Sequence, residues 1–491
     1  MGVNGLWHRE SVVAEVTADD WIRQPVLFDV AAMLYTSGAM NGVSEAFGLR
    51  EIAHQVSALV VTADPSVQDP SGIGDLIDAG RNADPTTPVS TRLDPTLLSH
   101  LDGSALLDRI GLLPRSQVAQ FAAKNPSSIE RMIVSPPKAA AVTSWWADLP
   151  AATRVSLGKT VPELVGNLDG LPFQARDAAN RLALKQAIAK ERSSVDSGLG
   201  RAQLVKGRHH LDVLEQVQRT LATKPGEPRR QLLTFDPKGE TRAAVVVGDL
   251  ATADYVSYLV PGMFFTVDGQ MYDWTVIAQD LYTEQASWLK LLAASDDSMA
   301  GKTTATVAWI GYDTPGVLSI ASLDRADEGA KFLGNAVRGV QAVRAGSEPY
   351  VTLISHSYGS TAAMIELAKG DVTVNALAMI GSPGSAAQSA SQLDVKGDNV
   401  YVGEAAWDPV VNTAFYGSDP GTAAFGAHKM SVAGGTDAVT HKKLTPAIGH
   451  LGYFDPGSEA MRNLALIGIG QDSLVTDGTL ADAGRTIAGA K

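Results

Sequence analysis

The sequence predicts an α/β fold: a mostly parallel β-sheet covered by helices on both faces and preceded by a helical N-terminal region. Three observations predict this fold. From residue 231 onward, short apolar runs alternate with segments of helix length. Residues 1–230 instead carry apolar residues near helical spacing. A strand-like run, a sharp turn and a helix follow one another directly in residues 350–370.

The chain is expected to have four parts. Residues 1–140 form a helical region with helices near 21–33, 44–60 and 95–123, interrupted by a linker at 62–95 that contains five prolines. Residues 141–230 form a helical segment, with helices at 173–194 and 211–222, that packs on the next domain. The α/β domain spans 231–470, and 471–491 form a tail. We interpret the Trp145-Trp146 pair and the turn at 166–172 as packing features.

Charge and composition narrow the expected function. The formal net charge of -13 at pH 7 disfavours binding to nucleic acid or to an anionic membrane, since both require clustered Lys and Arg. The absence of cysteine excludes disulfides, thiolate metal sites and a cysteine nucleophile. We see no secretory signal and no apolar run long enough to span a membrane, so we expect a cytoplasmic protein. Signal-independent export stays open, as does the oligomeric state.

The α/β domain is expected to begin with an antiparallel hairpin at one edge of its sheet. The turn Asp236-Pro-Lys-Gly239 separates the two runs that would form this hairpin. The remaining strands are expected to be parallel. The strands are predicted at 231–235, 242–247, 255–260, 305–310, 350–354, 376–380, 400–403 and about 429–432, and the helices at 273–294, 323–345, 358–370 and 458–467.

Ser357 is the candidate nucleophile. It lies at the centre of Ser355-His356-Ser357-Tyr358-Gly359, between a strand-like run and a helix, as in a nucleophile elbow. The usual elbow has glycine where this chain has Ser355, and serine is small enough for that position. A strand-to-helix turn without chemistry is the alternative interpretation of this segment.

Two backbone amides are candidates for an oxyanion hole. In an open parallel sheet, reactive groups lie at the carboxyl ends of the strands. The strand at 255–260 ends in Pro261-Gly262, and the glycine allows the Met263 amide to turn toward the elbow. The Tyr358 amide, at the start of the elbow helix, is the second candidate. A simple turn at the end of the strand is equally compatible with residues 261–264.

An acid and a histidine follow Ser357 in the order expected for a catalytic triad. Asp408 lies beyond the strand at 400–403 in a turn stiffened by Pro409, with Glu404 as the fallback. His450 lies in a glycine-flanked loop before the last helix, and is preferred over His428 and His441. His356 adjoins the nucleophile and is expected to point away from it.

These residues give the chain a resemblance to the α/β-hydrolases. It resembles in particular an actinobacterial α/β-hydrolase family of uncharacterised function, through Pro261-Gly262, the segment Trp309-Ile-Gly-Tyr-Asp-Thr-Pro315, the elbow, and His450-Leu-Gly-Tyr-Phe454. The resemblance extends over about 143–468. It implies the α/β-hydrolase fold and leaves the substrate undefined.

The sequence therefore predicts a serine hydrolase that cleaves a carboxylic ester or a related acyl bond of a small molecule. Ser357, Asp408 and His450 would be catalytic, and no metal or organic cofactor is required. Tyr312 and Asp313 would line the substrate pocket or brace a loop. An acyltransferase, a peptidase and a catalytically silent binding protein remain alternatives, and the helical region could act as a lid or a docking module.

Overall fold

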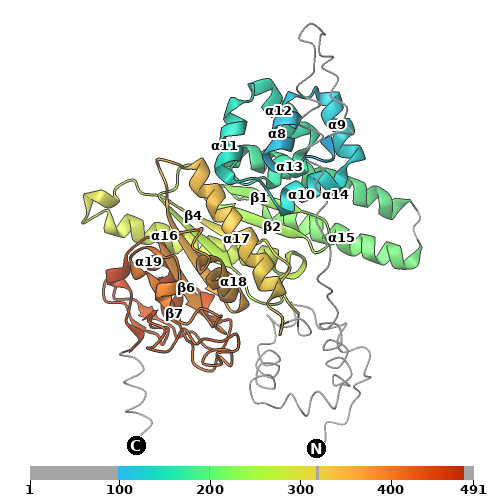
Figure 1. The fold of residues 1–491 in the computed structure, drawn as a ribbon. Helices are drawn as coiled ribbons and strands as arrows, with labels where there is room; N and C mark the ends of the chain where they lie inside the picture. The colour runs from blue at the N-terminus through green and yellow to red at the C-terminus, as the bar shows by residue number, and fades with distance from the viewer. Residues whose placement is uncertain (1–97, 198–199, 317–319, 480–491) are drawn as a thin grey trace, which may run out of the picture.

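The computed structural model describes residues 98–197, 200–316 and 320–479, and its centre is one eight-stranded sheet in the order β1-β2-β4-β3-β5-β6-β7-β8 (Figure 1). The strands are β1 (Arg230–Asp236), β2 (Arg242–Val247), β3 (Tyr255–Val260), β4 (Thr304–Ile310), β5 (Tyr350–His356), β6 (Ala376–Ile380), β7 (Val400–Gly403) and β8 (His428–Lys429). β2 runs antiparallel to β1 and to β4, and the pairs from β4 through β3 to β8 are parallel. The predicted fold class and its antiparallel edge are confirmed.

Helices cover both faces of the sheet because its strands are apolar on both sides. β4, for example, is buried along its whole length. On one face, α16 (Val267–Leu292), α19 (Glu459–Gly468) and α15 (Arg201–Thr220) share a core with the strands. On the other face, α17 (Asp324–Val343) and α18 (Tyr358–Leu367) do so. Short 3-10 turns lie at Asp297–Met299, Ala390–Gln392, Lys396–Asp398, Gly452–Phe454 and Asp472–Leu474.

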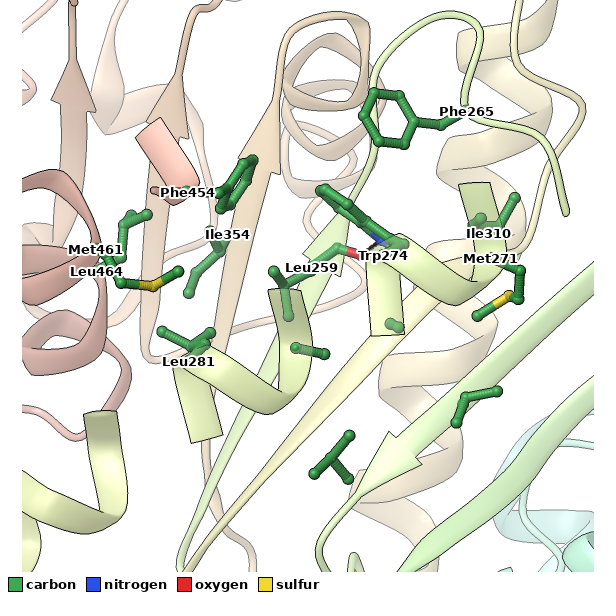
Figure 2. Packing of buried hydrophobic residues seen from close by; sticks show 14 of the residues in the cluster. Leu259, Phe265, Met271, Trp274, Leu281, Ile310, Ile354, Phe454, Met461 and Leu464 are labelled. Carbon is green, nitrogen blue, oxygen red and sulfur yellow. Dashed lines mark hydrogen bonds between the residues drawn. The ribbon is translucent and has the colours of Figure 1, made fainter. Parts of the chain in front are cut away.

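Trp274 of α16 ties two loops at the carboxyl edge of the sheet to the core (Figure 2). Its ring lies edge-on to Phe265, in the loop after β3, and to Phe454, four residues beyond His450, with centroid distances of 4.9 and 5.2 Å. Its indole N–H donates to the Leu259 carbonyl at 3.2 Å, so this buried polar group is satisfied. The loops that carry the candidate oxyanion amide and the candidate base therefore pack against one buried side chain.

The helical region has a core of its own. It comprises α8 (Gly103–Leu112), α9 (Arg115–Lys124), α10 (Pro126–Val134), α11 (Ala139–Asp148), α12 (Ala151–Thr160), α13 (Pro162–Asn167) and α14 (Phe173–Asp196). One apolar cluster extends from Leu98 to Ala179 and includes Trp146. The single helix expected at 95–123 is divided, because Pro114 forms the N-cap of α9. The elements expected within residues 1–97 lie outside the described residues.

Side chains of α13 and α14 bind the free edge of β1. The Asn167 amide accepts a hydrogen bond from the Phe235 N–H at 2.9 Å and donates one to the Phe235 carbonyl at 2.7 Å. Asp177 accepts from the Leu232 N–H at 2.8 Å, and Asn180 donates to the Leu232 carbonyl at 3.0 Å. These contacts satisfy buried backbone groups that an edge strand leaves unpaired. Helices α13 and α14 therefore lie at the β1 edge of the sheet, away from β6 and β7 (Figure 1).

The last predicted strand is shorter and lies earlier than expected. The expected range was about 429–432, whereas β8 contains only His428 and Lys429. Beyond it, the Met430 amide still donates to the Val402 carbonyl of β7 at 2.9 Å, and Met430 also forms an antiparallel bridge with Asp477. The Ser431 amide then donates to the Thr476 carbonyl, so at this residue the chain pairs with the C-terminal segment. A small hairpin of β9 (Gly435–Thr436) and β10 (Lys443–Leu444) follows. Among the described helices, none is long and apolar enough to cross a bilayer.

Candidate active site

Ser357 occupies a strained turn between β5 and α18. Its φ and ψ are 53° and -131°, a region that residues with a Cβ atom rarely adopt. The Ser357 amide donates to the Ile380 carbonyl at 3.0 Å, which holds the turn against the end of β6. Gly359 is required by close packing, since a Cβ there would lie 2.4 Å from the Pro261 carbonyl oxygen. The backbone is thus that of a nucleophile elbow.

Asp408 and His450 form a buried pair. His450 Nδ1 lies 2.9 Å from Asp408 Oδ1, and the side chains of the two residues are almost fully buried. Because an ionised carboxylate only accepts hydrogen bonds, Nδ1 carries the proton and Nε2 is left as the basic nitrogen. Glu404, the fallback acid, instead lies 3.4 Å from the Lys429 ammonium.

The two other histidines after Ser357 lie away from this pair. His428 is exposed in β8 and packs on Tyr401, and His441 is exposed in the turn between β9 and β10. Of the candidate acids and histidines predicted from the sequence, the structure therefore brings together Asp408 and His450.

Tyr453 gives Asp408 a second strong hydrogen bond. Its hydroxyl donates to Asp408 Oδ2 at 2.6 Å and accepts from the Ala405 amide at 2.9 Å, while the Val410 amide donates to Oδ1 at 2.9 Å. Burial opposes ionisation of Asp408, but His450 and these donors outweigh it and hold the pKa of the carboxyl below its ordinary value. Asp408 is accordingly an anion fixed at both oxygens.

His356 lies beneath His450. The two ring centroids are 4.5 Å apart, and His356 Nε2 donates to the His450 carbonyl oxygen at 2.7 Å, since a carbonyl can only accept. Burial, followed by the neighbouring His450, lowers the pKa of His356 to about 3. A neutral imidazole thus supports the loop that carries His450.

Gly381 joins the elbow to the Asp408–His450 pair. It follows Ile380, the acceptor of the Ser357 amide, and has φ of 58°. A Cβ at Gly381 would lie 2.9 Å from both Asp408 Oδ2 and His450 Cε1. One residue at the end of β6 therefore separates the backbone of Ser357 from the buried pair.

The loop after β3 packs directly on the elbow. A Cβ at Gly262 would lie 2.5 Å from Ser357 Cβ and 3.0 Å from Ser357 Oγ. The Met263 amide is the next one along the chain, and the Tyr358 amide begins α18 on the other side of Ser357. Both candidate oxyanion donors thus belong to segments that flank the serine.

Tyr312 and Asp313 are engaged with other residues of the protein. The Tyr312 hydroxyl donates to the Pro261 carbonyl at 2.8 Å, and its ring stacks on Trp309 with centroids 5.7 Å apart. Asp313 forms an ion pair with Arg325 at 2.6 Å. These contacts fit the second role expected for the two residues, bracing a loop, because Tyr312 supports the turn ahead of Met263.

The three candidate catalytic residues are buried. Ser357, Asp408 and His450 expose only 2, 7 and 4 % of their surface. No set of three or more His, Asp or Glu side chains within the described residues is arranged to hold a metal ion.

The sequence alone did not assign functions to three residues of the site: Gly381, His356 and Tyr453. The spacing His-x-x-Tyr could have indicated Tyr453, because it places this residue about one 3-10 turn after His450. Gly381 was indicated more weakly, as a glycine at the carboxyl end of a predicted strand.

Residues 236–418 match a family model described as alpha/beta hydrolase. The fold is that of an α/β-hydrolase. The predicted resemblance to the α/β-hydrolases is confirmed over these residues. The match includes Ser357 and Asp408 and ends before His450.

Two mycobacterial proteins are similar to parts of this chain. The chain is 29% identical over 405 residues to the uncharacterized protein Rv2079 of Mycobacterium tuberculosis, covering 73% of this chain and 60% of that protein. It is 29% identical over 238 residues to the uncharacterized protein Rv0963c of the same species, covering 48% of this chain and 84% of that one. The chain thus spans about three fifths of the length of the first relative, and neither relative has a described activity.

Solved structures with a similar arrangement include two esterases. A thermostable esterase from Pseudomonas putida covers 60% of this chain and 97% of its own, with 13% identity and a TM-score of 0.29. A hyperthermophilic esterase from Pyrobaculum calidifontis covers 57% and 96%, with 12% identity and a TM-score of 0.32. Similarity at this level does not define a substrate.

Proposed function

We propose that the protein is a serine hydrolase that cleaves a carboxylic ester of a small molecule. The observation that carries the proposal is the buried hydrogen bond of 2.9 Å between His450 Nδ1 and Asp408 Oδ1, adjoining a serine at a strained strand-to-helix turn. The hydrogen bond to Asp408 leaves Nε2 of His450 unprotonated, and in this proposal Nε2 accepts the proton of the Ser357 hydroxyl.

The proposed reaction has two stages. In the first, Ser357 Oγ attacks the ester carbonyl carbon while His450 Nε2 takes the hydroxyl proton. The C–O bond to the alcohol then breaks, and His450 gives that proton to the departing oxygen. In the second stage water, deprotonated by His450, attacks the acyl-enzyme and releases the carboxylic acid and free Ser357.

Asp408 and the two amides have supporting roles in this proposal. Asp408 fixes the imidazole tautomer and stabilises the imidazolium that forms in each stage, which suits an acid whose pKa is held low. The Met263 and Tyr358 amides would donate to the negative oxygen of the tetrahedral intermediate. Each such donor is typically worth about 3 kcal/mol in the barrier.

Labelling with a fluorophosphonate probe tests the proposal, because the probe phosphorylates an activated serine. We expect one adduct by intact mass in the wild type and none in Ser357→Ala, with labelling by His450→Ala slower by at least about 10³-fold. Ser391→Ala and His428→Ala, which change exposed residues outside the site, are matched controls that should label at the wild-type rate. Hydrolysis of p-nitrophenyl acetate should follow the same pattern. A folded wild type that neither labels nor hydrolyses would overturn the proposal.

A further inference from the structure

Two exposed apolar side chains adjoin the buried acid and base. Trp407 is 84% exposed and directly precedes Asp408, while Ile448 is 62% exposed and lies two residues before His450. The segments that carry them are neighbours, since Ala406 pairs with Ile448 in a parallel bridge and the Gly449 amide donates to the Ala406 carbonyl at 2.9 Å. Trp407 and Ile448, hereafter the apolar rim, are therefore exposed side chains on the two paired segments that carry Asp408 and His450.

The backbone at Trp407 shows that this exposure is not an incidental feature of a loose surface. Trp407 has φ of 64°, in the left-handed region where a bulky side chain is an outlier. A tryptophan there has both an unfavourable backbone conformation and a large apolar surface in water. Neither is offset by packing within the described structure, and both occur beside the acid of the proposed triad. Such a combination marks a residue that acts on contact with a ligand.

The position of the rim identifies which part of an ester it would meet. His450 must give its proton to the departing oxygen, so the alcohol part of the ester lies on the His450 side of the reacting carbon. The oxyanion donors Met263 and Tyr358 belong to other segments. The rim is built from the segments of Asp408 and His450 themselves, which places it on the alcohol side.

We infer that Trp407 and Ile448 bind the leaving alcohol, and that the enzyme prefers esters of apolar alcohols. The inference rests on the proposed function and specifies its substrate class. An anionic membrane surface does not suit the apolar rim as a partner, since the chain has a formal net charge of -13. An apolar alcohol needs no charge on the protein and gains from each methylene that leaves water.

The test compares two series of esters at constant enzyme concentration. The alcohol series is methyl, butyl and hexyl acetate; the acyl series is methyl acetate, butanoate and hexanoate. A fully buried methylene is worth about fourfold, so a contact on one side predicts about twofold per methylene, or roughly 30-fold in kcat/KM from methyl to hexyl acetate. In Trp407→Asn and in Ile448→Ala this ratio should fall at least threefold, with the acyl series keeping its wild-type ratio.

Asparagine suits the test because it tolerates positive φ, so Trp407→Asn should melt at or above the wild-type temperature. Val205→Ala shortens an apolar side chain on α15 that is as exposed as Ile448, at 62%, and should leave both ratios unchanged. Since all acetates share one acyl-enzyme, the effect should appear in kcat/KM and not in a kcat limited by deacylation.

Three results would overturn the inference. They are an unchanged alcohol ratio in both variants, a fall confined to the acyl series, and a Trp407→Asn protein that melts well below the wild type, which would mean a packing role. Failure of the proposed function is distinguished by the wild type: without fluorophosphonate labelling and acetate hydrolysis, both proposals fail together.

Discussion

The imidazole of His356 lies against that of His450, with its Nε2 donating to the His450 carbonyl oxygen at 2.7 Å and the ring centroids 4.5 Å apart. The residue before the candidate nucleophile thus supports the candidate base, 94 residues away in sequence. Burial keeps His356 neutral, and protonating it would place a charge in this buried position, so this part of the fold is sensitive to acid.

We expect His356 to make the fold less stable as the pH falls from about 6.5 toward 3. Its folded pKa is about 3, whereas an unfolded histidine titrates near 6.5, so within this window the unfolded chain binds a proton that the folded chain does not. The contribution of neutral His356 to the free energy of unfolding is fully present above about pH 6.5. Below that pH it declines by up to about 1.4 kcal/mol per pH unit. His356→Gln keeps an amide donor and does not titrate. Denaturant unfolding between pH 4.5 and 7.5 should give a shallower pH dependence in this variant, and identical slopes would contradict the assignment.

Tyr453→Phe should weaken both stability and activity. The change removes the donor to Asp408 Oδ2 and leaves the buried Ala405 amide without its acceptor, which costs about 1–3 kcal/mol of unfolding free energy. The pKa of Asp408 should rise. We expect kcat/KM to fall about tenfold, because Asp408, the partner of the His450 imidazole, is then held less firmly.

Tyr350→Phe is the control for Tyr453→Phe. Tyr350 begins β5 at the opposite end of the strand from the elbow and packs on Tyr255, so its variant should keep wild-type kcat/KM. If both variants lost activity equally, the hydrogen bond to Asp408 would have no special role. Thermal melting and ester hydrolysis measure the two effects separately.

Gly262→Ala should displace the nucleophile while leaving the fold intact. The added methyl would lie 2.5 Å from Ser357 Cβ, so either the elbow or the loop after β3 has to move. A shift of about 1 Å at a reacting atom can cost about 10²-fold in rate, and we expect a loss of that size in fluorophosphonate labelling and in kcat/KM.

Gly158→Ala is the matched control, because nothing lies within 4 Å of a Cβ at this position in α12. It should leave activity unchanged and raise stability by about 0.5–1 kcal/mol, the usual gain for alanine in a helix. Retained activity in Gly262→Ala would show that the loop can move without cost, and would weaken the role proposed for Met263.

Asn167→Ala should weaken the attachment of the helical region to the edge of the sheet. The variant leaves the Phe235 N–H and C=O without their partners in a buried position, and we expect a loss of roughly 2–4 kcal/mol in unfolding free energy. Hydrogen exchange should accelerate at the Phe235 amide in particular.

Gln218→Ala, which removes an exposed amide from α15, is the comparison for this change and should alter stability by less than about 0.5 kcal/mol. Equal stability of the two variants would mean that the Asn167 contacts contribute nothing net.

The elements that could be predicted from the sequence were those with local causes. The strands and the elbow follow from apolar periodicity, glycine and proline, all within a few residues of one another. The same logic placed Asp408 beyond the end of a strand and His450 in a glycine-flanked loop before the last helix, although their pairing is seen only in the structure.

The missed features join distant parts of the chain. Tyr453 acts on a carboxylate 45 residues earlier, and Asn167 on a backbone group 68 residues later. No local pattern indicates such partners. The last strand was mispredicted for the same reason, since Met430 also bridges to Asp477, 47 residues later, and Ser431 then bonds to the C-terminal segment.

The side chains along β1 also bear on self-association. An open edge strand can recruit a strand from another copy and so extend the sheet from molecule to molecule. Asn167, Asp177 and Asn180 occupy the backbone groups through which such a strand would join. At the opposite end, β8 has only two residues, too few to template a partner. Neither edge of the eight-stranded sheet is therefore open to a strand from another copy, and the sheet does not extend beyond a single molecule.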